Sequence, residues 1–549
     1  MATDTERLST DTTPLESAGA EASRLADRRK LLIVIGALMM GMFLAALDQT
    51  IVSTALPTIA GDLHGLNHLS WVVTSYLLAS TISIPLWGKL GDLYGRKGFF
   101  QAAVVIFLAG SMLSGLAHNM VELISSRALQ GIGAGGLMVG AQACMGDLVS
   151  PRERGRYVGM FGAMFGVASV LGPLLGGVFT ERLSWRWIFY INLPLGIVTL
   201  FVITSVLHLP RQRKQHKIDY IGTMLLGAAV TGVILLTTWG GTTYPWHSTP
   251  IIALGVASVA LIVAFMYLET KVPEPLIPPS LFKMKVFNLS SAVGFMVGLV
   301  MFGALIYLPL YLQTAHGASP TSSGLQLLPV VVGMLITSNL GGQLTSRRGK
   351  YKMFPIMGCA LMAMGLAGLS TMQVTTPLLV SSCYMLLVGL GVGFVMQILV
   401  VIVMNAAPQE DLGAATSSAT FFRSIGGVFG VAVLGAIFNS RLLNELPKYL
   451  PAAALKAVHA ASGNIASNPA QLAALPAPIH HGFVEAFGHS LTFVFLIGVP
   501  FAVVAFVLSW FIPEIPLRDK AFVSVRYEEQ LADLAPMSDD LTEHPAVGG

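Results

Sequence analysis

The sequence predicts an all-α membrane protein that crosses the bilayer many times. Of its 549 residues, 54% are hydrophobic and only 11% are charged, whereas soluble domains contain about 25% charged residues. Apolar runs of about 20 residues recur along the chain with short polar turns between them, which is typical of membrane-spanning helices and not of a β-barrel. The three cysteines show neither the spacing of a disulfide framework nor that of a metal site.

Fourteen apolar runs are long enough to cross a hydrocarbon core of about 30 Å. We expect the spans at residues 31–54, 69–89, 98–117, 121–146, 156–180, 187–208, 218–239, 250–268, 286–313, 321–346, 353–371, 375–405, 416–438 and 487–512. An even number of spans places both termini on one side. Most of the 32 lysines and arginines then fall on that side, so the positive-inside rule predicts cytoplasmic termini in a plasma (inner) membrane.

An internal repeat divides the chain into two halves. Residues 88–96 (GKLGDLYGR) and 342–350 (GQLTSRRGK) share the spacing of their glycines, a leucine and a terminal basic residue. Two halves of the same orientation predict binding at the interface between them. We expect a disordered cytoplasmic tail (1–30), a six-helix bundle (31–208), two extra helices with linkers (209–285), a second six-helix bundle (286–512) containing a long external loop (440–486), and a cytoplasmic tail (513–549).

The segment between the second and third spans combines glycines with opposite charges. Gly88 and Gly95 supply the backbone freedom that a sharp turn needs, and Asp92 and Arg96 can pair across it. Together with Arg96, Lys97 marks the turn as cytoplasmic. The ordered pattern Gly-x-Leu-Gly-Asp-x-x-Gly-Arg-Lys resembles the loop 2–3 signature of the major facilitator superfamily.

This resemblance implies the major facilitator fold, with 14 transmembrane helices arranged as 6+2+6 in two pseudo-symmetric halves. It also implies that the loop biases the protein toward an outward-open state and does not touch the substrate. Arg152 and Arg154 follow the fourth span. We expect them to contact the Asp92–Arg96 loop when the cytoplasmic side is closed.

Two ionisable residues are predicted to lie inside the membrane at similar depth. Asp48 is near the outer end of the first span, and Arg127 is near the outer start of the fourth. Such residues are costly in a bilayer, face the interior of a helix bundle and usually pair. Burial favours the uncharged carboxyl and Arg127 favours the carboxylate, so the pair is a candidate proton switch. The alternative is a structural ion pair that joins two helices.

The sequences around both residues resemble motifs of the fourteen-span drug:proton antiporter family. Residues 47–57 (LDQTIVSTALP) resemble its first-span motif. Residues 123–133 (LISSRALQGIG) resemble the fourth-span motif of the superfamily, which is linked there to proton transfer. The resemblance implies that Asp48 carries the proton and that Arg127 tunes it.

The fifth span contains a glycine-rich face with one proline. Its residues are Gly166, Gly172, Pro173, Gly176 and Gly177. Small residues allow helices to approach closely, and proline bends a helix. The pattern resembles the antiporter motif, which is absent from symporters and uniporters and is thought to prevent leak. It departs from that motif at Ala168, where glycine is usual.

Arg423 is the other arginine expected within a span. It is placed near the cytoplasmic end of the thirteenth span. Either its side chain reaches the membrane interface, or it lines the mouth of the inner cavity.

The sequence contains no P-loop, no Gly-x-Ser-x-Gly elbow and no His-Glu-x-x-His. We therefore predict no catalytic residues, no metal, no cofactor and no enzyme activity, and the proton motive force as the energy source. The expected partners are a small amphipathic substrate, protons and membrane lipid, without nucleic acid, and the protein is expected to be a monomer.

The family resemblance implies a proton-coupled exporter of amphipathic drugs or antibiotics that works by alternating access. Export of an endogenous metabolite, siderophore or lipid stays open as an alternative, as does proton-coupled symport on the same fold. A polytopic membrane enzyme or receptor is the alternative from another class.

Overall fold

The computed structural model describes residues 14–63, 69–207, 219–240, 244–318, 320–451 and 476–517. The secondary structure of these ranges is helical. The long helices are α1 (Pro14–Asp62), α2 (Leu69–Tyr94), α3 (Arg96–Leu116), α4 (Met120–Leu148), α5 (Pro151–Arg182), α7 (Asn192–Val206), α8 (Tyr220–Trp239), α9 (Thr249–Glu269), α11 (Lys285–Ala315), α13 (Leu328–Arg348), α14 (Met353–Ser370), α15 (Leu378–Ala406), α16 (Leu412–Tyr449) and α19 (Ala477–Trp510). The short ones are α6 (Trp187–Tyr190), α10 (Pro279–Phe282), α12 (Pro320–Gln326) and the 3-10 turn η2 (Gln409–Asp411).

Thirteen helices of the described chain are long and apolar enough to cross a membrane. The predicted span at 121–146 is not among them. It corresponds to α4, which is 29 residues long but rich in glycine, serine and glutamine. Because α4 packs against α1, α2 and α3, its polar side chains are enclosed by other helices. With α4 included, the helices match the fourteen predicted spans, and the all-helical membrane fold is confirmed.

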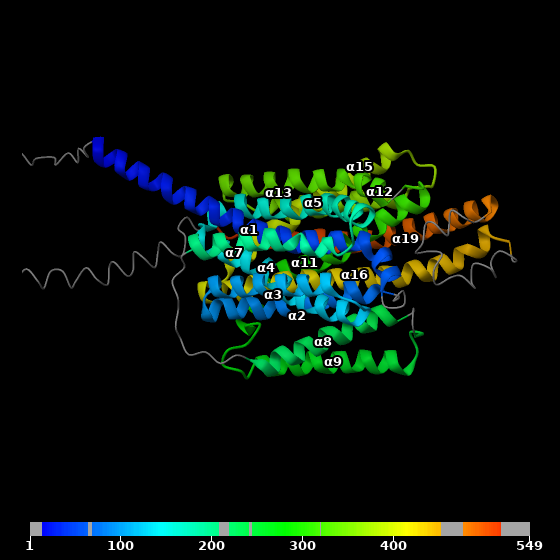
Figure 1. Cartoon of the computed structure of the whole chain (residues 1–549), viewed down its shortest axis with the longest axis horizontal. Coiled ribbons are helices and arrows are strands. Elements are labelled where there is room, and N and C mark those ends of the chain that lie inside the picture. Colours follow the sequence, from blue (N-terminus) through cyan, green and yellow to red (C-terminus); the bar gives the residue numbers. More distant parts are fainter. Residues whose placement is uncertain are drawn as a thin grey trace, which may run out of the picture.

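The long helices run side by side along one axis of the molecule (Figure 1). We call the end where α2 finishes and α3 begins the basic end, because Lys89, Lys97 and Arg152 lie near it. The opposite end, where α16 finishes and α19 begins, is the far end. In Figure 1 the basic end is on the left and the far end is on the right.

Several helices extend past the predicted boundaries. The first helix begins at Pro14, inside the segment predicted as a disordered tail, because residues 15–30 are rich in alanine, leucine and charged residues that favour helix. At the far end, α16 continues to Tyr449 and α19 starts at Ala477. These extensions shorten the external loop that was predicted over 440–486. Residues 1–13, 208–218, 452–475 and 518–549 of the predicted tails, linker and loop lie outside the described residues.

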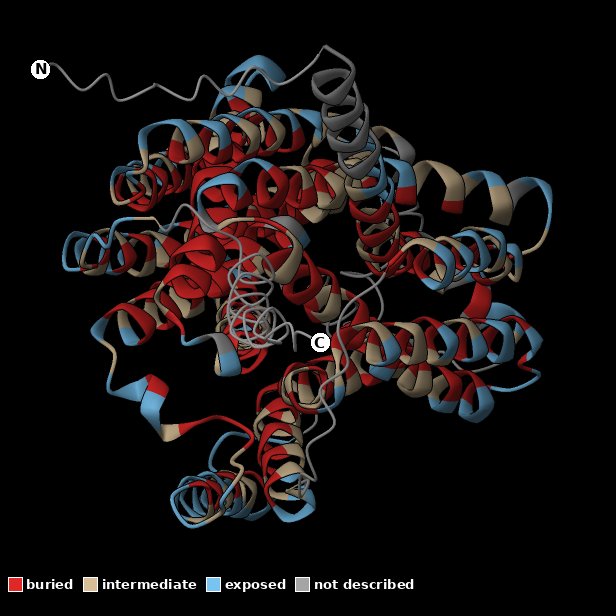
Figure 2. Cartoon of the chain, turned by 90° about the vertical axis from the view of Figure 1, so that its left-hand side faces the viewer, coloured by how far each residue is buried: buried red, intermediate tan, exposed pale blue. Residues whose placement is uncertain are grey.

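Two large groups of buried side chains form most of the core. One fills the second half and includes Leu308, Met362 and Phe487. The other begins in the first half around Phe107 and reaches Met404 of α15 at the basic end. Figure 2 views the basic end and shows buried residues inside the packing and exposed residues on its outer side. The second cluster therefore joins the halves at the basic end.

The helices α8 and α9 lie at one edge of the molecule, on the side opposite α5 and α13 (Figure 1). Besides pairing with α9, α8 packs against α2 of the first half and α16 of the second. A buried cluster that includes Ile84, Val230 and Phe421 joins the three helices. We call the pair α8 and α9 the insert, because they connect the two halves in sequence.

Candidate functional site

Asp48 lies at the centre of a buried polar network in the first half. Its carboxylate accepts hydrogen bonds from Arg127 Nη1 at 2.5 Å, from Gln130 Nε2 at 2.8 Å and from Asn192 Nδ2 at 3.1 Å. These donors come from α4 and from the first residue of α7, whereas Asp48 belongs to α1. Asp48, Gln130 and Asn192 are 0% exposed, and Arg127 is 1% exposed. The structure thus brings the two predicted residues into direct contact.

Arg127 is held from several sides. Its Nη1 also donates to Gln130 Oε1 at 2.7 Å, and its guanidinium lies over the ring of Tyr76, 4.1 Å from the centroid. The Tyr76 hydroxyl in turn donates to the Ala45 carbonyl at 3.1 Å. A buried ion pair needs such additional contacts, because its mutual attraction alone does not repay desolvation of two charges. Arg127 is therefore fixed in position while Asp48 faces it.

A second branch of the network runs from Asp48 to α3 and α6. Asn192 Nδ2 lies 3.0 Å from Ser111 Oγ, and Ser111 Oγ donates to the Phe189 carbonyl at 2.8 Å. Among the described residues, the buried Asn192 Oδ1 has no hydrogen-bond partner. A buried acceptor without a partner costs free energy. The site therefore has one unused acceptor close to the carboxylate, where a proton donor such as a protonated carboxyl would be favoured.

The predicted gate loop is part of a contact between the halves at the basic end. Asp92 accepts hydrogen bonds from the backbone amides of Gly413 at 3.0 Å and Ala414 at 2.7 Å, in the first turn of α16. It also pairs with Arg96 at 2.8 Å. A carboxylate at a helix N-terminus satisfies free amides and the positive end of the helix dipole. Gly95, with φ of 99°, supplies the left-handed turn between Asp92 and Arg96.

The repeat produces a corresponding contact at the other interface between the halves. Ser346 is the counterpart of Asp92, and its hydroxyl accepts from the Arg156 amide at 3.2 Å, in the second turn of α5. The glycines correspond as well: a Cβ on Gly88 would lie 2.7 Å from the Gly413 carbonyl, and a Cβ on Gly342 would overlap the Gly155 carbonyl. Two backbone-to-backbone contacts, α2–α16 and α5–α13, thus close the basic end.

The other predicted gate residues have different partners. Instead of the Asp92–Arg96 loop, buried Arg154 contacts the carbonyls of Gly146 at 2.5 Å, Val149 at 3.1 Å and Met404 at 3.3 Å. A buried guanidinium at the ends of α4 and α15 binds free carbonyls of the last helical turns, which explains this position.

Two further predicted residues also bind backbone carbonyls. Arg152 Nε lies 3.4 Å from the Ser346 carbonyl of α13, and Lys97 Nζ donates to the Thr204 carbonyl at 2.8 Å. The acid that contacts Arg96 in addition to Asp92 is Asp147, at 2.5 Å from Arg96 Nε.

The glycine-rich face of α5 contacts both α1 and the second half. A Cβ on Gly172 would overlap the Thr50 hydroxyl of α1, and that hydroxyl lies 2.9 Å from the Ala168 carbonyl. A Cβ on Gly166 would lie 3.2 Å from Val331 of α13.

The remaining predicted residues of this face lie farther along α5. Pro173 lies beside Gly324 of α12, since a Cβ on Gly324 would be 3.3 Å from its ring. The carbonyls of Gly176 and Gly177 accept from Thr180, at 2.8 Å and 3.0 Å. An antiporter-specific role of these residues stays a prediction.

Arg423 lies deeper than expected. It follows Leu412, the first residue of α16, by eleven positions, which is about 16 Å along the helix. A Cβ on Gly294 of α11 would be 3.8 Å from Arg423 Cβ. Arg423 forms no ion pair with any carboxylate of the described residues. Both interpretations, a side chain that reaches the membrane interface and a role at the cavity mouth, stay predictions.

Sequence reasoning did not assign roles to Gln130, Asn192 and Asp147. Gln130 is three residues after Arg127 on the same helix face, a spacing that signals a shared environment. Asn192 and Asp147 sit at a helix start and near a helix end, where polar residues are common. No spacing in the sequence connects them to Asp48 or Arg96.

Comparison with known proteins places the chain in a family. Residues 38–222 and 218–431 match the family described as the Major Facilitator Superfamily. The chain is 44% identical to an uncharacterised MFS-type transporter of Mycobacterium tuberculosis (strain ATCC 25618 / H37Rv), over 89% of this chain and 70% of that protein. It is 38% identical to the multidrug transporter protein MdtP of Bacillus subtilis (strain 168), over 93% and 98% of the two chains.

A solved structure has the same fold. The proton:xylose symporter XylE, in complex with 6-bromo-6-deoxy-D-glucose, superposes with a TM-score of 0.60 over 89% of this chain and 97% of that chain, at 16% identity. This likeness concerns the fold alone. Together with the two family matches, it shows that the chain belongs to the major facilitator superfamily of secondary transporters.

Proposed function

We propose that this transporter exports amphipathic drugs or antibiotics in exchange for protons, with Asp48 as the proton carrier. The observation that carries the proposal is the buried Asp48–Arg127 contact, in which a titratable carboxylate accepts three hydrogen bonds away from solvent. Burying an ionisable group at such depth costs free energy, so a group of this kind inside a membrane protein usually has a function. The name of the multidrug transporter MdtP supports the substrate class.

The network allows the carboxylate to change its charge without unfolding the site. When Asp48 is charged, Arg127, Gln130 and Asn192 all donate to it. When Asp48 is protonated, a turn of the Asn192 amide brings its unpartnered Oδ1 toward the carboxyl as an acceptor. Arg127 then keeps Gln130 and the Tyr76 ring as partners. Both protonation states therefore have hydrogen-bond partners within the network.

The proposed cycle alternates between closure of the basic end and closure of the far end. The structure has the basic end closed by the α2–α16 and α5–α13 contacts. Protonation of Asp48 from outside weakens its attraction to Arg127, and opening of the basic end then admits the substrate from the cytosol or the inner leaflet. A membrane potential contributes roughly 2.3 kcal/mol per charge per 100 mV. In this proposal the basic end is cytoplasmic, the membrane is the plasma (inner) membrane, and the protein works as a monomer.

The test is substrate-driven proton movement in proteoliposomes, with ethidium and a panel of antibiotics. Asp48→Asn keeps the shape of the side chain and removes the titratable group, so we expect substrate binding without proton exchange. Asp62→Asn is the matched control, because exposed Asp62 is on the same helix and its carboxylate accepts from Trp185 Nε1 at 2.9 Å. We expect this control to exchange protons normally.

A second variant separates coupling from folding. Asp48→Asn alone leaves Arg127 buried without its counter-ion, which costs several kcal/mol. The double variant Asp48→Asn with Arg127→Gln restores neutrality, so it should fold and bind while failing to couple. Normal coupling in either variant would overturn the role of Asp48, and no proton movement by the wild type with any compound would overturn drug:proton exchange itself.

Export of an endogenous metabolite, siderophore or lipid uses the same site and the same cycle. Proton symport is less well supported, because the α5 face resembles the motif of antiporters. Transport direction in right-side-out vesicles distinguishes the two.

A further inference from the structure

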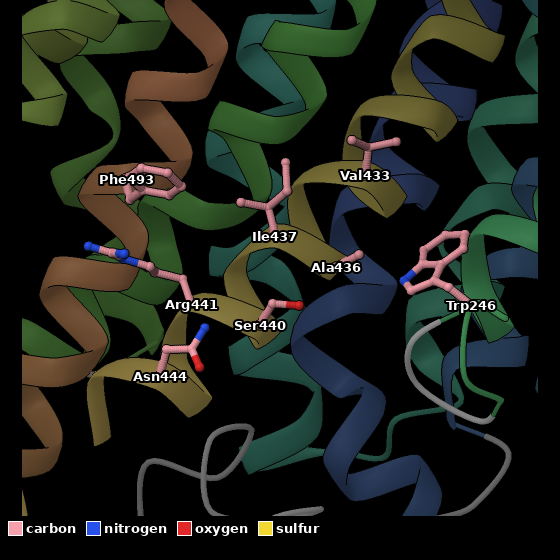
Figure 3. A pocket seen from close by; sticks show the side chains of 8 residues that line it. All are labelled: Trp246, Val433, Ala436, Ile437, Ser440, Arg441, Asn444 and Phe493. Atoms are coloured by element: carbon pink, nitrogen blue, oxygen red, sulfur yellow. The ribbon is translucent and has the colours of Figure 1, made fainter. Parts of the chain in front are cut away.

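A pocket of about 500 Å³ lies at the far end between α16, α19 and the connection from α8 to α9 (Figure 3). It is lined by Trp246, Val433, Ala436, Ile437, Ser440, Arg441, Asn444 and Phe493. Six of these eight belong to α16, one to α19 and one to the insert connection. The pocket therefore lies apart from Asp48 and its network.

The polarity of the pocket lining changes along the membrane normal. Toward the middle of the bundle it is apolar, with Val433 and Ile437. Toward the far end it is polar, with Arg441 and Asn444. From Val433 to Asn444 the helix rises about 16 Å. A ligand that fits this gradient has an apolar part directed into the membrane and a polar part directed out of it.

The polar end of the pocket lies at the height of lipid headgroups. At the basic end, Asp92 of α2 is level with Gly413 of α16. Twenty-one residues farther from the basic end, about 32 Å along each helix, α2 reaches Trp71 and α16 reaches Leu434. Trp71 packs edge-on against Trp239 at 6.5 Å, and tryptophans of this kind mark the membrane interface. Arg441 and Asn444 lie beyond this level, outside the hydrocarbon layer.

The pocket opens toward lipid. Phe493 begins a stripe on α19 that continues with the exposed residues Leu496, Val503 and Val507. Exposed apolar residues at helical spacing on a membrane-spanning helix are the surface that contacts acyl chains. A molecule in the surrounding leaflet can therefore enter the pocket sideways.

The charges around the pocket favour an anion. Glu445 pairs with both Arg441 at 2.8 Å and Lys448 at 2.9 Å, so two cations share one carboxylate. The Arg441 guanidinium lies over the Phe493 ring, 4.8 Å from its centroid, which orients it along the pocket wall. Its buried Nε has no hydrogen-bond partner among the described residues. A ligand oxygen would supply the partner that this donor lacks, and the Arg441 side chain, which is 41% exposed, is accessible to a ligand.

We propose that this pocket binds one anionic phospholipid from the leaflet at the far end. The phosphate accepts hydrogen bonds from Arg441 and Asn444, and the first part of the acyl chains packs against Val433 and Ile437. Trp246 covers the side of the lipid next to the insert. The bound lipid thereby joins the insert to α16 and α19 at the far end, in addition to the cluster around Phe421 that joins α8 to α16.

The test is native mass spectrometry of the full chain released from mixed vesicles of phosphatidylglycerol and phosphatidylethanolamine. We expect the wild type to retain one phosphatidylglycerol in preference to phosphatidylethanolamine. Removal of the cation in Arg441→Gln should weaken retention about fivefold, and Trp246→Ala should weaken retention of both lipids. Arg182→Gln is the matched control, because exposed Arg182 is the last residue of α5, at the far end, and does not line the pocket.

Selective loss of phosphatidylglycerol in Arg441→Gln, with Arg182→Gln unchanged, supports the site. Equal loss of phosphatidylglycerol in both variants indicates that the lipid responds to the general surface charge and not to this pocket. Unchanged retention in Arg441→Gln indicates that the lipid binds elsewhere. Either result overturns the proposal. Thermal unfolding of each variant in detergent identifies a variant that fails to fold. If Arg441→Gln fails to fold, Arg441→Lys replaces it, because lysine keeps the charge and lacks the Nε donor.

Discussion

A single carboxylate with three donors is the centre of the proposed coupling site. Of the three donors, Arg127 is the charged one, whereas Gln130 and Asn192 are neutral amides that orient the carboxylate. Each of the three groups donates a hydrogen bond that the carboxylate accepts. The neutral partners therefore help to hold the Asp48 carboxylate in position beside Arg127.

Gln130→Ala tests this contribution. The variant removes a donor from Asp48 and an acceptor from Arg127. Hydrogen bonds to charged groups contribute about 1.5–3 kcal/mol, so we expect coupled proton exchange to slow by about tenfold. The measurement is the initial rate of ethidium-driven proton movement in proteoliposomes.

Gln142→Ala is the matched control, because Gln142 is buried on the same helix but faces Thr420 of α16 at 3.4 Å. Its rate of proton exchange should stay that of the wild type. A rate that is unchanged in Gln130→Ala, or lowered equally in both variants, would contradict the assigned role of Gln130.

At the scale of helices, closure of the basic end depends on backbone contact. The α2–α16 and α5–α13 contacts each place a glycine of one half against a carbonyl of the other. The two contacts differ in chemistry, because the Asp92 carboxylate caps the first turn of α16 while the Ser346 hydroxyl meets Arg156 in the second turn of α5. An anion at a helix N-terminus contributes about 0.3–2 kcal/mol, so the α2–α16 contact has a stabilisation that the α5–α13 contact lacks.

Gly88→Ala tests the backbone contact. The added Cβ would lie 2.7 Å from the Gly413 carbonyl and overlap the Ser417 side chain. Because backbone atoms cannot move aside without a large cost in free energy, the added methyl group should hold the basic end open. We expect transport to fall at least about tenfold, which corresponds to roughly 1.4 kcal/mol. Spin labels at Lys89 and Glu410, measured by double electron–electron resonance, should show a longer distance.

Gly98→Ala serves as the control, because a Cβ there meets no atom within 4 Å. Wild-type distances and transport in Gly88→Ala would mean that the basic end does not close through this contact.

The helices could be predicted because each apolar run is about as long as a bilayer is thick. Their ends could not, because Pro14–Lys30 of α1 and the last turns of α16 remain helical after the hydropathy has fallen. The depth of Asp48 and Arg127 predicted that they could meet. Asn192 was missed because an amide at a helix start gives no charge signal, and the position of Arg154 was missed because only the tertiary fold brings Met404 beside it.

At the scale of the whole molecule, the segment after α19 crosses the basic end. The Tyr351 hydroxyl donates to the Pro513 carbonyl at 3.0 Å and accepts from the Ile515 amide at 2.6 Å. Asn405 Nδ2 lies 3.3 Å from the Pro516 carbonyl, and Leu517 packs against the core clusters of both halves. This short segment therefore joins the two halves from outside the helices.

Tyr351→Phe should weaken this connection. The loss of two hydrogen bonds costs about 1–2 kcal/mol, which should lower the thermal unfolding temperature in detergent. Tyr384→Phe is the control, since its half-buried hydroxyl has no hydrogen bond to the described residues. Equal unfolding temperatures for Tyr351→Phe and the wild type would show that the segment does not stabilise the fold.

The insert has a consequence for any motion that separates α2 from α16. Because α8 packs against both helices, it cannot keep both contacts when they part. Either it travels with one half while the other slides past it, or it detaches from both. On the opposite edge, α5 and α13 meet without the insert (Figure 1). The two interfaces between the halves are therefore not equivalent. A molecule dissolved in the bilayer meets the insert beside the α2–α16 interface, whereas the insert does not cover the α5–α13 interface.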